Sequence, residues 1–377
     1  MKVEIKEVLT AREYLSFVKF AEELYKDEPN WVCPLRSDEL SVLRRDKNPS
    51  YEYCLAKLFL AYCDGKVVGR VAAIVNHKSN AVWNEKRLRF GWFDFIDDYS
   101  VSEALIAKVE EWAYELGMEK VSGPQGFNDM DKQGLLVEGF EKRATANTLY
   151  NFAYYLEHLE RLGYCKEVDW IQRVLTVPEL MPEKIAQFSE IVKERFGLRI
   201  LEKVTRKDLY KFAIELFETY NKAFASLYCF SPLSPKEYKL LVKQFVPILN
   251  QDMIVILLDK RDQLAAFAIT MPSIAVALQK AKGRLFPFGF IHLKKALANY
   301  EEMEMNLIGA LPEYRNKGVN AIIFHQLNIQ YVKYGVKKLV SYPMLENNES
   351  VQRIFDYYPM APYMRRRCLV KHINKSN

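Results

Sequence analysis

Two tandem α/β domains are the fold that the sequence predicts, and three observations support it. The same order of elements, a β-hairpin followed by strand, helix, strand, helix and strand, occurs in residues 55–177 and again in residues 253–373. Amphipathic helices occupy the region between these two blocks. The length of 377 residues corresponds to about two domains. We therefore expect a boundary near residue 180, with domains spanning residues 1–180 and 181–377.

The first block begins with a hairpin around Asp64-Gly65, because these residues tolerate the positive φ that a tight turn requires. An aromatic strand follows. Apolar residues at helical spacing then indicate a helix that Ser100 or Ser102 caps and Gly117 ends. The predicted strands are residues 55–75 (a pair), 89–96, 120–122 and 168–177, and the predicted helices are residues 101–116 and 150–162.

The second block repeats this order after three connecting helices. Its hairpin turns at residues 260–262, and Gly335 ends its main helix. The connecting helices are predicted at residues 182–196, 208–224 and 238–249. The strands are predicted at residues 253–258, 265–270, 304–311, 339–344 and 366–373, and the helices at residues 320–334 and 350–358.

The overall composition excludes several classes of protein. Half of the residues are apolar, and Gly and Pro number only 15 each, so the chain is neither disordered nor collagen-like. The longest apolar stretch, residues 265–278, is shorter than the roughly 20 residues of a membrane-spanning helix. The first residues do not have the pattern of a secretory signal. We therefore expect a cytoplasmic protein without a membrane as partner.

The charged and metal-binding residue types point to neither a nucleic acid nor a metal. The net charge of +6 comes from basic residues that are mostly interspersed with acidic ones. The one dense run, Arg365-Arg366-Arg367, lies on the last strand and is predicted to protect an exposed sheet edge. The six cysteines form no C-x-x-C pair, and no two of the five histidines are four residues apart. We therefore expect no metal cofactor and no nucleic-acid partner.

Residues 307–327 carry the most informative pattern of the sequence. A strand runs into Pro312, a short polar loop follows, and an apolar helix begins within a few residues of Gly318. The start of a helix offers unpaired N–H groups and the positive end of the helix dipole, which together bind phosphate groups. Arg315 and Lys317 add positive charge beside it. The pattern indicates an anion site, although many helices without one also follow glycine-containing loops.

The loop in this segment, Pro312-Glu313-Tyr314-Arg315-Asn316-Lys317-Gly318-Val319-Asn320, resembles the acyl-CoA loop of the GCN5-related N-acetyltransferases (GNAT). That loop reads Pro-x-x-Arg-x-x-Gly-x-Gly/Ala between a strand and a helix, and Asn320 departs from its last small residue. The resemblance implies acetyl-CoA as acyl donor, and in each domain a mixed, mostly antiparallel sheet flanked by helices. It implies CoA contacts, to the pyrophosphate from the loop and to the pantetheine from the strand, by Ile308, Ala310, Leu311, Arg315, Asn316, Lys317, Gly318, Val319, Asn320 and Ala321.

The resemblance also implies residues at the start of the next helix. In the family an Asn and a small residue stand there, and a Tyr that protonates the leaving thiolate commonly follows. Asn347 and Ser350 have a suitable spacing, whereas Ile354 occupies the position of the Tyr. A thiolate needs only modest acid assistance, so Tyr357, Tyr358 or water is expected to substitute.

A general base is needed to take a proton from an ammonium nucleophile. In the resembled family a carboxylate on the strand before the CoA loop often serves. Glu302, Glu304 and Asn306 alternate onto one face of that strand. Glu304 is the best-placed candidate, and the alternative is an ordinary exposed glutamate.

The first block keeps the order of elements but lacks the loop. Asp97 and Asp98 stand at the corresponding helix start, where they would repel a pyrophosphate. We interpret this half as a degenerate GNAT-like domain. Its long loop, residues 122–151, is predicted to be either a lid over the substrate or a cover for a sheet edge.

The function that these observations favour is N-acyl transfer, most simply of acetyl, from acyl-CoA to an amine by direct attack on the thioester. An amino acid, a polyamine, a peptide terminus and an aminoglycoside remain open as acceptors. One alternative is an aminoacyl-tRNA-dependent transferase, whose tRNA would bind the arginine run. The other is a non-catalytic acyl-CoA-binding module, which Ile354 favours.

Overall fold

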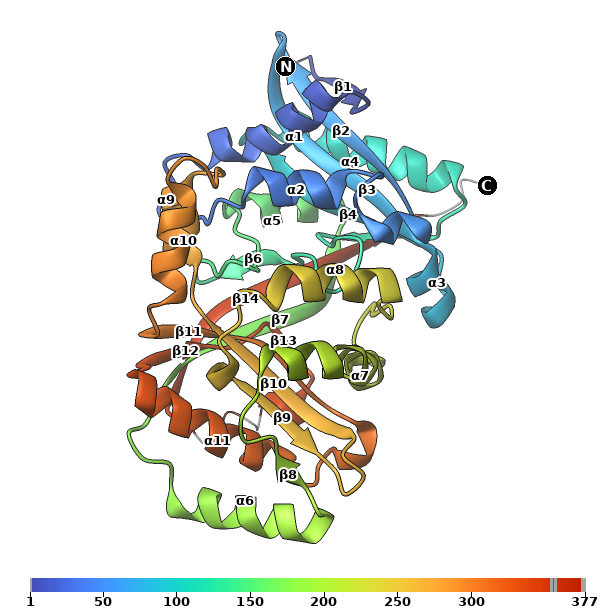
Figure 1. Cartoon of the computed structure of the whole chain (residues 1–377). Coiled ribbons are helices and arrows are strands. Elements are labelled where there is room, and N and C mark those ends of the chain that lie inside the picture. The colour runs from blue at the N-terminus through green and yellow to red at the C-terminus, as the bar shows by residue number, and fades with distance from the viewer. Residues whose placement is uncertain (1, 353–354, 356–357, 374–377) are drawn as a thin grey trace. The chain divides into compact units, whose positions relative to one another are not determined.

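The computed structural model describes residues 2–352, 355 and 358–373, and it divides the chain into two compact units (Figure 1). The first unit comprises Met1–Trp170, Ala275–Leu293 and Met364–Asn377. The second comprises Ile171–Ile274 and Lys294–Tyr363. The division after Trp170 differs from the boundary expected near residue 180, and two later segments return to the first unit.

The first unit is a mixed sheet with helices packed on it. Its sheet order is β1-β2-β3-β4-β5-β14, and the neighbours are antiparallel except for β4 and β5, where Arg87 pairs with Lys120 in parallel. The strands are β1 (Glu4–Glu7), β2 (Cys54–Cys63), β3 (Lys66–Asn76), β4 (Arg87–Phe95), β5 (Lys120–Gly123) and β14 (Met360–His372). The helices are α1 (Ala11–Leu24), α2 (Arg36–Leu43), α3 (His77–Trp83), α4 (Tyr99–Glu115), α5 (Tyr154–Arg161) and α9 (Ala275–Ala281), with the short η1 (Pro49–Glu52).

The second unit has the same plan. Its sheet order is β7-β12-β11-β10-β9-β8, and its one parallel pair is β11 and β12, where Glu302 pairs with Lys338. The strands are β7 (Cys165–Thr176), β8 (Arg199–Ile200), β9 (Ile254–Leu258), β10 (Leu264–Pro272), β11 (Glu302–Ala310) and β12 (Lys338–Val340), and the two-residue β13 (Met344–Leu345) pairs with β7. The helices are α6 (Glu183–Phe196), α7 (Arg206–Phe224), α8 (Pro235–Phe245), α11 (Val319–Tyr334) and α12 (Glu349–Gln352), with η2 (Gln251–Met253) and η3 (Pro312–Tyr314), and α10 (Gly289–Leu297) begins in the first unit and ends in the second.

The two halves of the chain exchange their last strands. The strand that closes the first block, β7, continues into the second unit, where Thr176 pairs with Lys338 of β12. The final strand of the chain, β14, returns to the first unit, where Leu369 pairs with Gly123 of β5. The predicted strands are therefore present, but each one completes the sheet of the other block.

The core of the second unit surrounds α11. Ile322, Phe324 and Leu327 have no exposed surface and pack with strand residues such as Val255 and Met303. Helix α6 covers α11 from outside. A helix that is apolar on nearly every side must be enclosed in this way. Its first turn is consequently held in a fixed place.

Several elements differ from their predictions. Asp98, and neither Ser100 nor Ser102, caps α4, because the Asp98 carboxylate accepts from the Ser100 N–H. The helix expected at residues 350–358 is described only as α12, and residues 353, 354, 356 and 357 lie outside the described residues. The long loop contains a short strand, β6 (Leu135–Glu138), which pairs with β14. Within the described chain, no helix has the length and apolar character needed to cross a bilayer.

Candidate functional site: an open helix start beside a splayed strand

The start of α11 exposes backbone donors in the way that an anion site requires. Asn316 and Gly318 both have positive φ, of 57° and 81°, and Gly318 caps the helix without any side-chain hydrogen bond. Of the hydrogen bonds between described residues, none uses the backbone N–H groups from residue 316 to residue 320. The positive end of the dipole of a 16-residue helix lies at the same place.

The side chains of the loop are held by their neighbours. The Arg315 guanidinium donates to the Lys222 and Ala223 carbonyls at the end of α7, so it stabilises that helix end. The Lys317 ammonium lies 5.0 Å from the centre of the Phe196 ring. Backbone amides, more than these two cations, are therefore what the loop presents to a ligand.

Gly318 is required by the packing as well as by its φ angle. A Cβ at residue 318 would lie 2.7 Å from Phe188 Cε1 and 3.0 Å from Val192 Cγ2, both on α6. A Cβ atom would therefore require the Phe188 ring, and to a lesser extent Val192, to shift. The close approach of α6 thus fixes the loop that opens α11.

Strands β11 and β12 separate beside this helix start. Their parallel pairing ends where Glu304 meets Val340, and the next residue, Ser341, donates its N–H to the Arg173 carbonyl on β7. Residues 305–310 continue with β10 as their described strand partner. Ile308, Ala310 and Leu311 are only half-buried here. After the two strands separate, the edge of β11 that faced β12 is available to an extended ligand.

Asn306 forms a β-bulge in this free part of β11. Thr270 pairs with Met305 and Ile269 with Leu307, so Asn306 has no opposite residue. The Asn306 Oδ1 atom is enclosed and has no hydrogen-bond partner among the described residues. A bulge redirects side chains, and it frequently accompanies an active site.

Glu304 lies next to the bulge and is buried. Its side chain is 6% exposed, and its carboxylate accepts a hydrogen bond of 2.7 Å from the Ser273 hydroxyl. The alternative of an ordinary exposed glutamate is therefore wrong. The Ser273 hydroxyl thus fixes the position of this buried carboxylate, and its role as general base stays a prediction.

The structure gives less support to the other predicted site residues. Asn347 is exposed in the turn after β13, and Ser350 lies in α12. Tyr357 and Ile354 lie outside the described residues. Tyr358 is buried against Phe324, where its hydroxyl donates to the Phe324 carbonyl at 3.5 Å and burial raises its pKa. These surroundings suit a packing residue, and a catalytic role for either tyrosine stays a prediction.

Comparisons with known proteins agree with this architecture. No family model matches the chain. It is 27% identical to protein YghO of Escherichia coli K12, over 98% of this chain and 95% of YghO, and 25% identical to a bacterial ceramide synthase of Caulobacter vibrioides, over 76% and 74%. A tandem GNAT protein from the clavulanic acid biosynthesis pathway matches all of both chains with a TM-score of 0.57 at 12% identity. The chain has the tandem GNAT fold.

A second solved structure supports this assignment. The GCN5-related glucosamine N-acetyltransferase region of a fungal multi-domain β-N-acetylglucosaminidase matches 98% of this chain and 38% of that protein, with a TM-score of 0.56 and 14% identity. The predicted fold class, two GNAT-like units with mostly antiparallel sheets, is thus confirmed.

Two places that are open in the second unit, the start of the helix and the space beside the strand before it, are both occupied in the first GNAT unit. Asp98 caps α4, with its carboxylate 2.8 Å from the Ser100 nitrogen, so the helix start already holds an anion. The space beside β4 is filled by the chain that follows β5, where the Gln125 N–H donates to the Phe90 carbonyl at 2.7 Å. A Cβ at residue 91 would collide with the Gln125 carbonyl.

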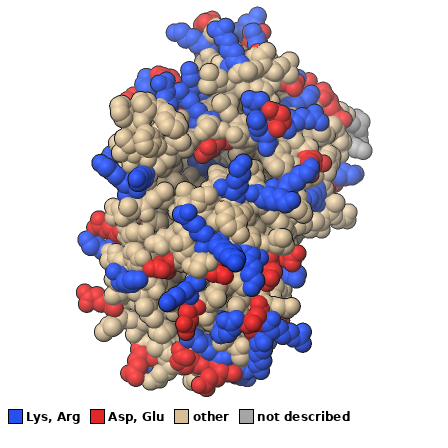
Figure 2. Space-filling model, in the orientation of Figure 1, with Lys and Arg blue, Asp and Glu red and all other residues tan. Residues whose placement is uncertain are grey.

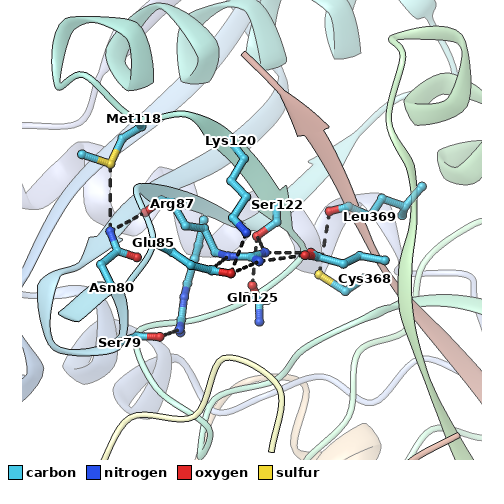
Figure 3. A network of polar contacts seen from close by, with 12 residues as sticks. Ser79, Asn80, Glu85, Arg87, Met118, Lys120, Ser122, Gln125, Cys368 and Leu369 are labelled. Carbon is cyan, nitrogen blue, oxygen red and sulfur yellow. Dashed lines mark hydrogen bonds and ion pairs between the residues drawn. The ribbon is translucent and has the colours of Figure 1, made fainter. Parts of the chain in front are cut away.

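A polar network reinforces this closed part of the first unit (Figure 3). The Arg87 side chain is 2% exposed and donates to the Ser122 hydroxyl at 2.7 Å and to both carboxylate oxygens of Glu167. The Ser122 hydroxyl in turn donates to Gln125 at 3.2 Å. In Figure 3 the Arg87 and Lys120 side chains meet at Glu85, and Ser122 links Arg87 to Gln125. The network therefore fixes the segment that fills the space.

The arginine run on β14 is internal, not an exposed sheet edge as predicted. Arg365 and Arg367 bind the buried carboxylate of Asp169, at 3.1 Å and 2.9 Å. Arg366 is 1% exposed and donates to the Leu149 carbonyl at 3.0 Å. These contacts weaken the alternative of a tRNA-dependent transferase, since the arginines already have partners.

Proposed function

We propose that the protein is an N-acyltransferase that uses acyl-CoA and that its second unit carries the reaction. The observation that carries this proposal is the uncapped start of α11 beside the separated strands β11 and β12. The first unit supports it by contrast, because there the same two places are occupied by Asp98 and by residues 124–126. One unit is suited to bind CoA and the other is not.

The proposed binding roles follow from these donors. The backbone amides of residues 315–321 would hold the CoA pyrophosphate, since the N–H groups of residues 316–320 have no partner among the described residues and lie at the positive end of the helix dipole. The pantetheine arm would lie along β11 at Ile308, Ala310 and Leu311, where no described strand pairs with the edge opposite β10. Asn347 and Ser350 would contact the same ligand from the turn and helix after β13.

The proposed chemistry is direct attack of an amine on the thioester. Glu304, through water or directly, would accept the ammonium proton as the nucleophile forms. Backbone N–H groups of β11 near Ile308 would stabilise the oxyanion. Tyr357 or Tyr358 would protonate the leaving thiolate, or water would do so. No step needs a metal.

The acyl group and the acceptor have two candidate descriptions. Acetyl transfer is the simpler one. The name of the Caulobacter relative, a ceramide synthase, favours a second: ceramides are amides, formed when a fatty acyl group joins the amine of a sphingoid base. Both are N-acyl transfer, so one assay with two donors separates them.

The binding half of the proposal is tested with Asn320→Asp. Asn320 is the second residue of α11, where a carboxylate interacts favourably with the helix dipole, so the variant should fold at least as well. The same charge would repel a pyrophosphate by roughly 1–3 kcal/mol, which weakens CoA binding about ten- to a hundredfold. Isothermal titration with CoA measures the loss.

The matched control is Gln326→Glu, the same chemical change farther along α11. It should leave CoA affinity unchanged. Unaltered affinity in the Asn320→Asp variant, or no CoA binding at millimolar concentration in the original protein, would contradict the proposed site.

The catalytic half is tested by thiol release from acetyl-CoA and palmitoyl-CoA with a panel of amines that includes sphinganine. Amine-dependent release of CoA supports an enzyme. Binding of CoA without release on any amine would instead favour the non-catalytic acyl-CoA-binding module.

A further inference from the structure

A cluster of aromatic rings is exposed in the loop between α9 and α10 and at the start of α10. In this Phe segment, residues 285–291, the side chains of Phe286, Phe288 and Phe290 are 71%, 67% and 43% exposed, and Ile291 is exposed as well. The Phe286 and Phe290 rings contact each other, with their centres 5.7 Å apart. Single exposed apolar residues are common, but a contiguous aromatic cluster indicates an interaction surface.

The Phe segment is fixed to the first unit and is not a loose loop. The Gln279 side chain of α9 donates to the Pro29 and Trp31 carbonyls at 2.7 Å and 2.9 Å. The Arg36 N–H donates to the Gly283 carbonyl at 3.0 Å. Inside the segment, the Phe290 N–H donates to the Leu285 carbonyl at 2.8 Å. These hydrogen bonds fix the segment to the first unit while its aromatic rings stay exposed.

The charged residues of the sequence around the Phe segment are all basic. From residue 263 to residue 300 the sequence contains no Asp or Glu. The nearest acidic side chain beneath Gly283, Glu22, is already paired with Arg36. The exposed basic residues of this region are Lys280, Lys282, Arg284, Lys294 and Lys295.

The figures show the same arrangement. This part of the chain is orange in Figure 1, and the surface over the loop between α9 and α10, at the upper left of Figure 2, is mostly uncharged with blue side chains next to it. Aromatic rings flanked by Lys and Arg are typical of segments that bind where the acyl chains of a membrane meet its anionic headgroups.

We propose that the Phe segment binds the surface of an anionic phospholipid membrane. The phenyl rings insert at the level of the headgroups and upper acyl chains, and Lys280, Lys282 and Arg284 contact the lipid phosphates. This reverses the expectation that the protein has no membrane as partner, which rested on the lack of a spanning segment. Helix α10, with nine residues, is too short to cross the membrane and would lie at its surface. The inference does not rest on acyl transfer or on CoA binding.

Co-sedimentation of the full chain with lipid vesicles tests the proposal. We expect binding to phosphatidylcholine vesicles that contain phosphatidylglycerol, weaker binding to phosphatidylcholine alone, and a decrease as salt rises. Replacing Lys280, Lys282 and Arg284 together by Gln should lower the partition coefficient by about two orders of magnitude at low salt, since each cation near the surface accounts for about fivefold.

The aromatic contribution is tested with the double variant Phe286→Ser and Phe288→Ser. Both side chains are exposed, so the fold should not change, and partitioning should fall at least about tenfold. The matched control replaces two equally exposed apolar residues elsewhere, Leu9→Ser and Leu180→Ser, and should keep vesicle binding.

Two results would overturn the proposal. One is that the double Phe variant sediments with anionic vesicles as the original protein does, or that the original protein does not sediment at all. The other is that light scattering shows a dimer that only the double Phe variant loses, without vesicle binding, since the Phe segment would then join two copies of this chain.

Discussion

At the scale of single residues, the buried Glu304 carboxylate is the strongest candidate for a catalytic group. Replacing it by Gln keeps its shape and its capacity to accept from Ser273, but removes the proton acceptor. We expect the kcat of Glu304→Gln to fall by about 10² or more at neutral pH, while CoA affinity stays within about twofold.

Glu302→Gln is the matched control, because it makes the same change two residues earlier on β11 at a half-buried position. Steady-state rates and titration with CoA give the two quantities separately. A loss of CoA affinity as large as the loss of kcat in Glu304→Gln would show that Glu304 supports the strand and not the proton transfer.

Residue-scale features of the site could be predicted from sequence only where they depend on local conformation. Gly318 and the loop before it follow from a strand, a short polar loop and a helix. The burial of Glu304 and the bulge at Asn306 could not be predicted, because they depend on which residues of β10 lie opposite. That register is set by pairing along the whole hairpin, not by the few residues around the site.

At the scale of elements, the two corresponding helices α4 and α11 differ in how they begin. The Asp98 carboxylate accepts from the Ser100 hydroxyl and N–H, at 2.6 Å and 2.8 Å, and these bonds lower its pKa. Removing such a cap costs about 1 kcal/mol. Asp98→Ala should therefore lower the thermal midpoint by roughly 2–4 °C at neutral pH, as circular dichroism can measure.

The pH dependence of that difference follows from the direction of the pKa shift. A carboxylate whose pKa is lower in the folded state stabilises the fold above its unfolded pKa of about 3.9, and the stabilisation is lost as the pH falls through the folded pKa. The gap between the original protein and Asp98→Ala should thus shrink below about pH 4. Glu103→Ala, an exposed change on the same helix, should show no such gap.

Element boundaries were predictable where a helix has its own start and stop signals. Gly335 ends α11 as predicted, and α6 ends at Phe196, as the predicted range 182–196 has it. Both helices are capped by a glycine with positive φ, Gly335 and Gly197. The role of Arg366 was not predictable, because its partner is the carbonyl of Leu149, more than two hundred residues away along the chain. Contacts of that kind come from strand order, which a single sequence does not reveal.

At the scale of the whole molecule, the exchange of β7 and β14 means that each unit depends on a distant part of the chain. All five tryptophans, at residues 31, 83, 92, 112 and 170, lie in the first unit, so their fluorescence reports on that unit. Leu369, at the end of the chain, is fully buried in the core of that unit. Leu175, at the end of the first block, is fully buried in the core of the second.

This arrangement predicts which unit each strand stabilises, and the order of elements along the chain predicts the opposite. Truncating a buried Leu to Ala costs about 2–5 kcal/mol at either position, because each leaves a cavity. If β14 completes the first unit, Leu369→Ala should lower the guanidinium midpoint followed by tryptophan fluorescence by more than Leu175→Ala does. The two variants are matched in chemistry and burial, so the comparison isolates the unit that each strand supports. A larger fluorescence shift for Leu175→Ala would mean that each strand belongs to its own block, as the order of elements along the chain predicts.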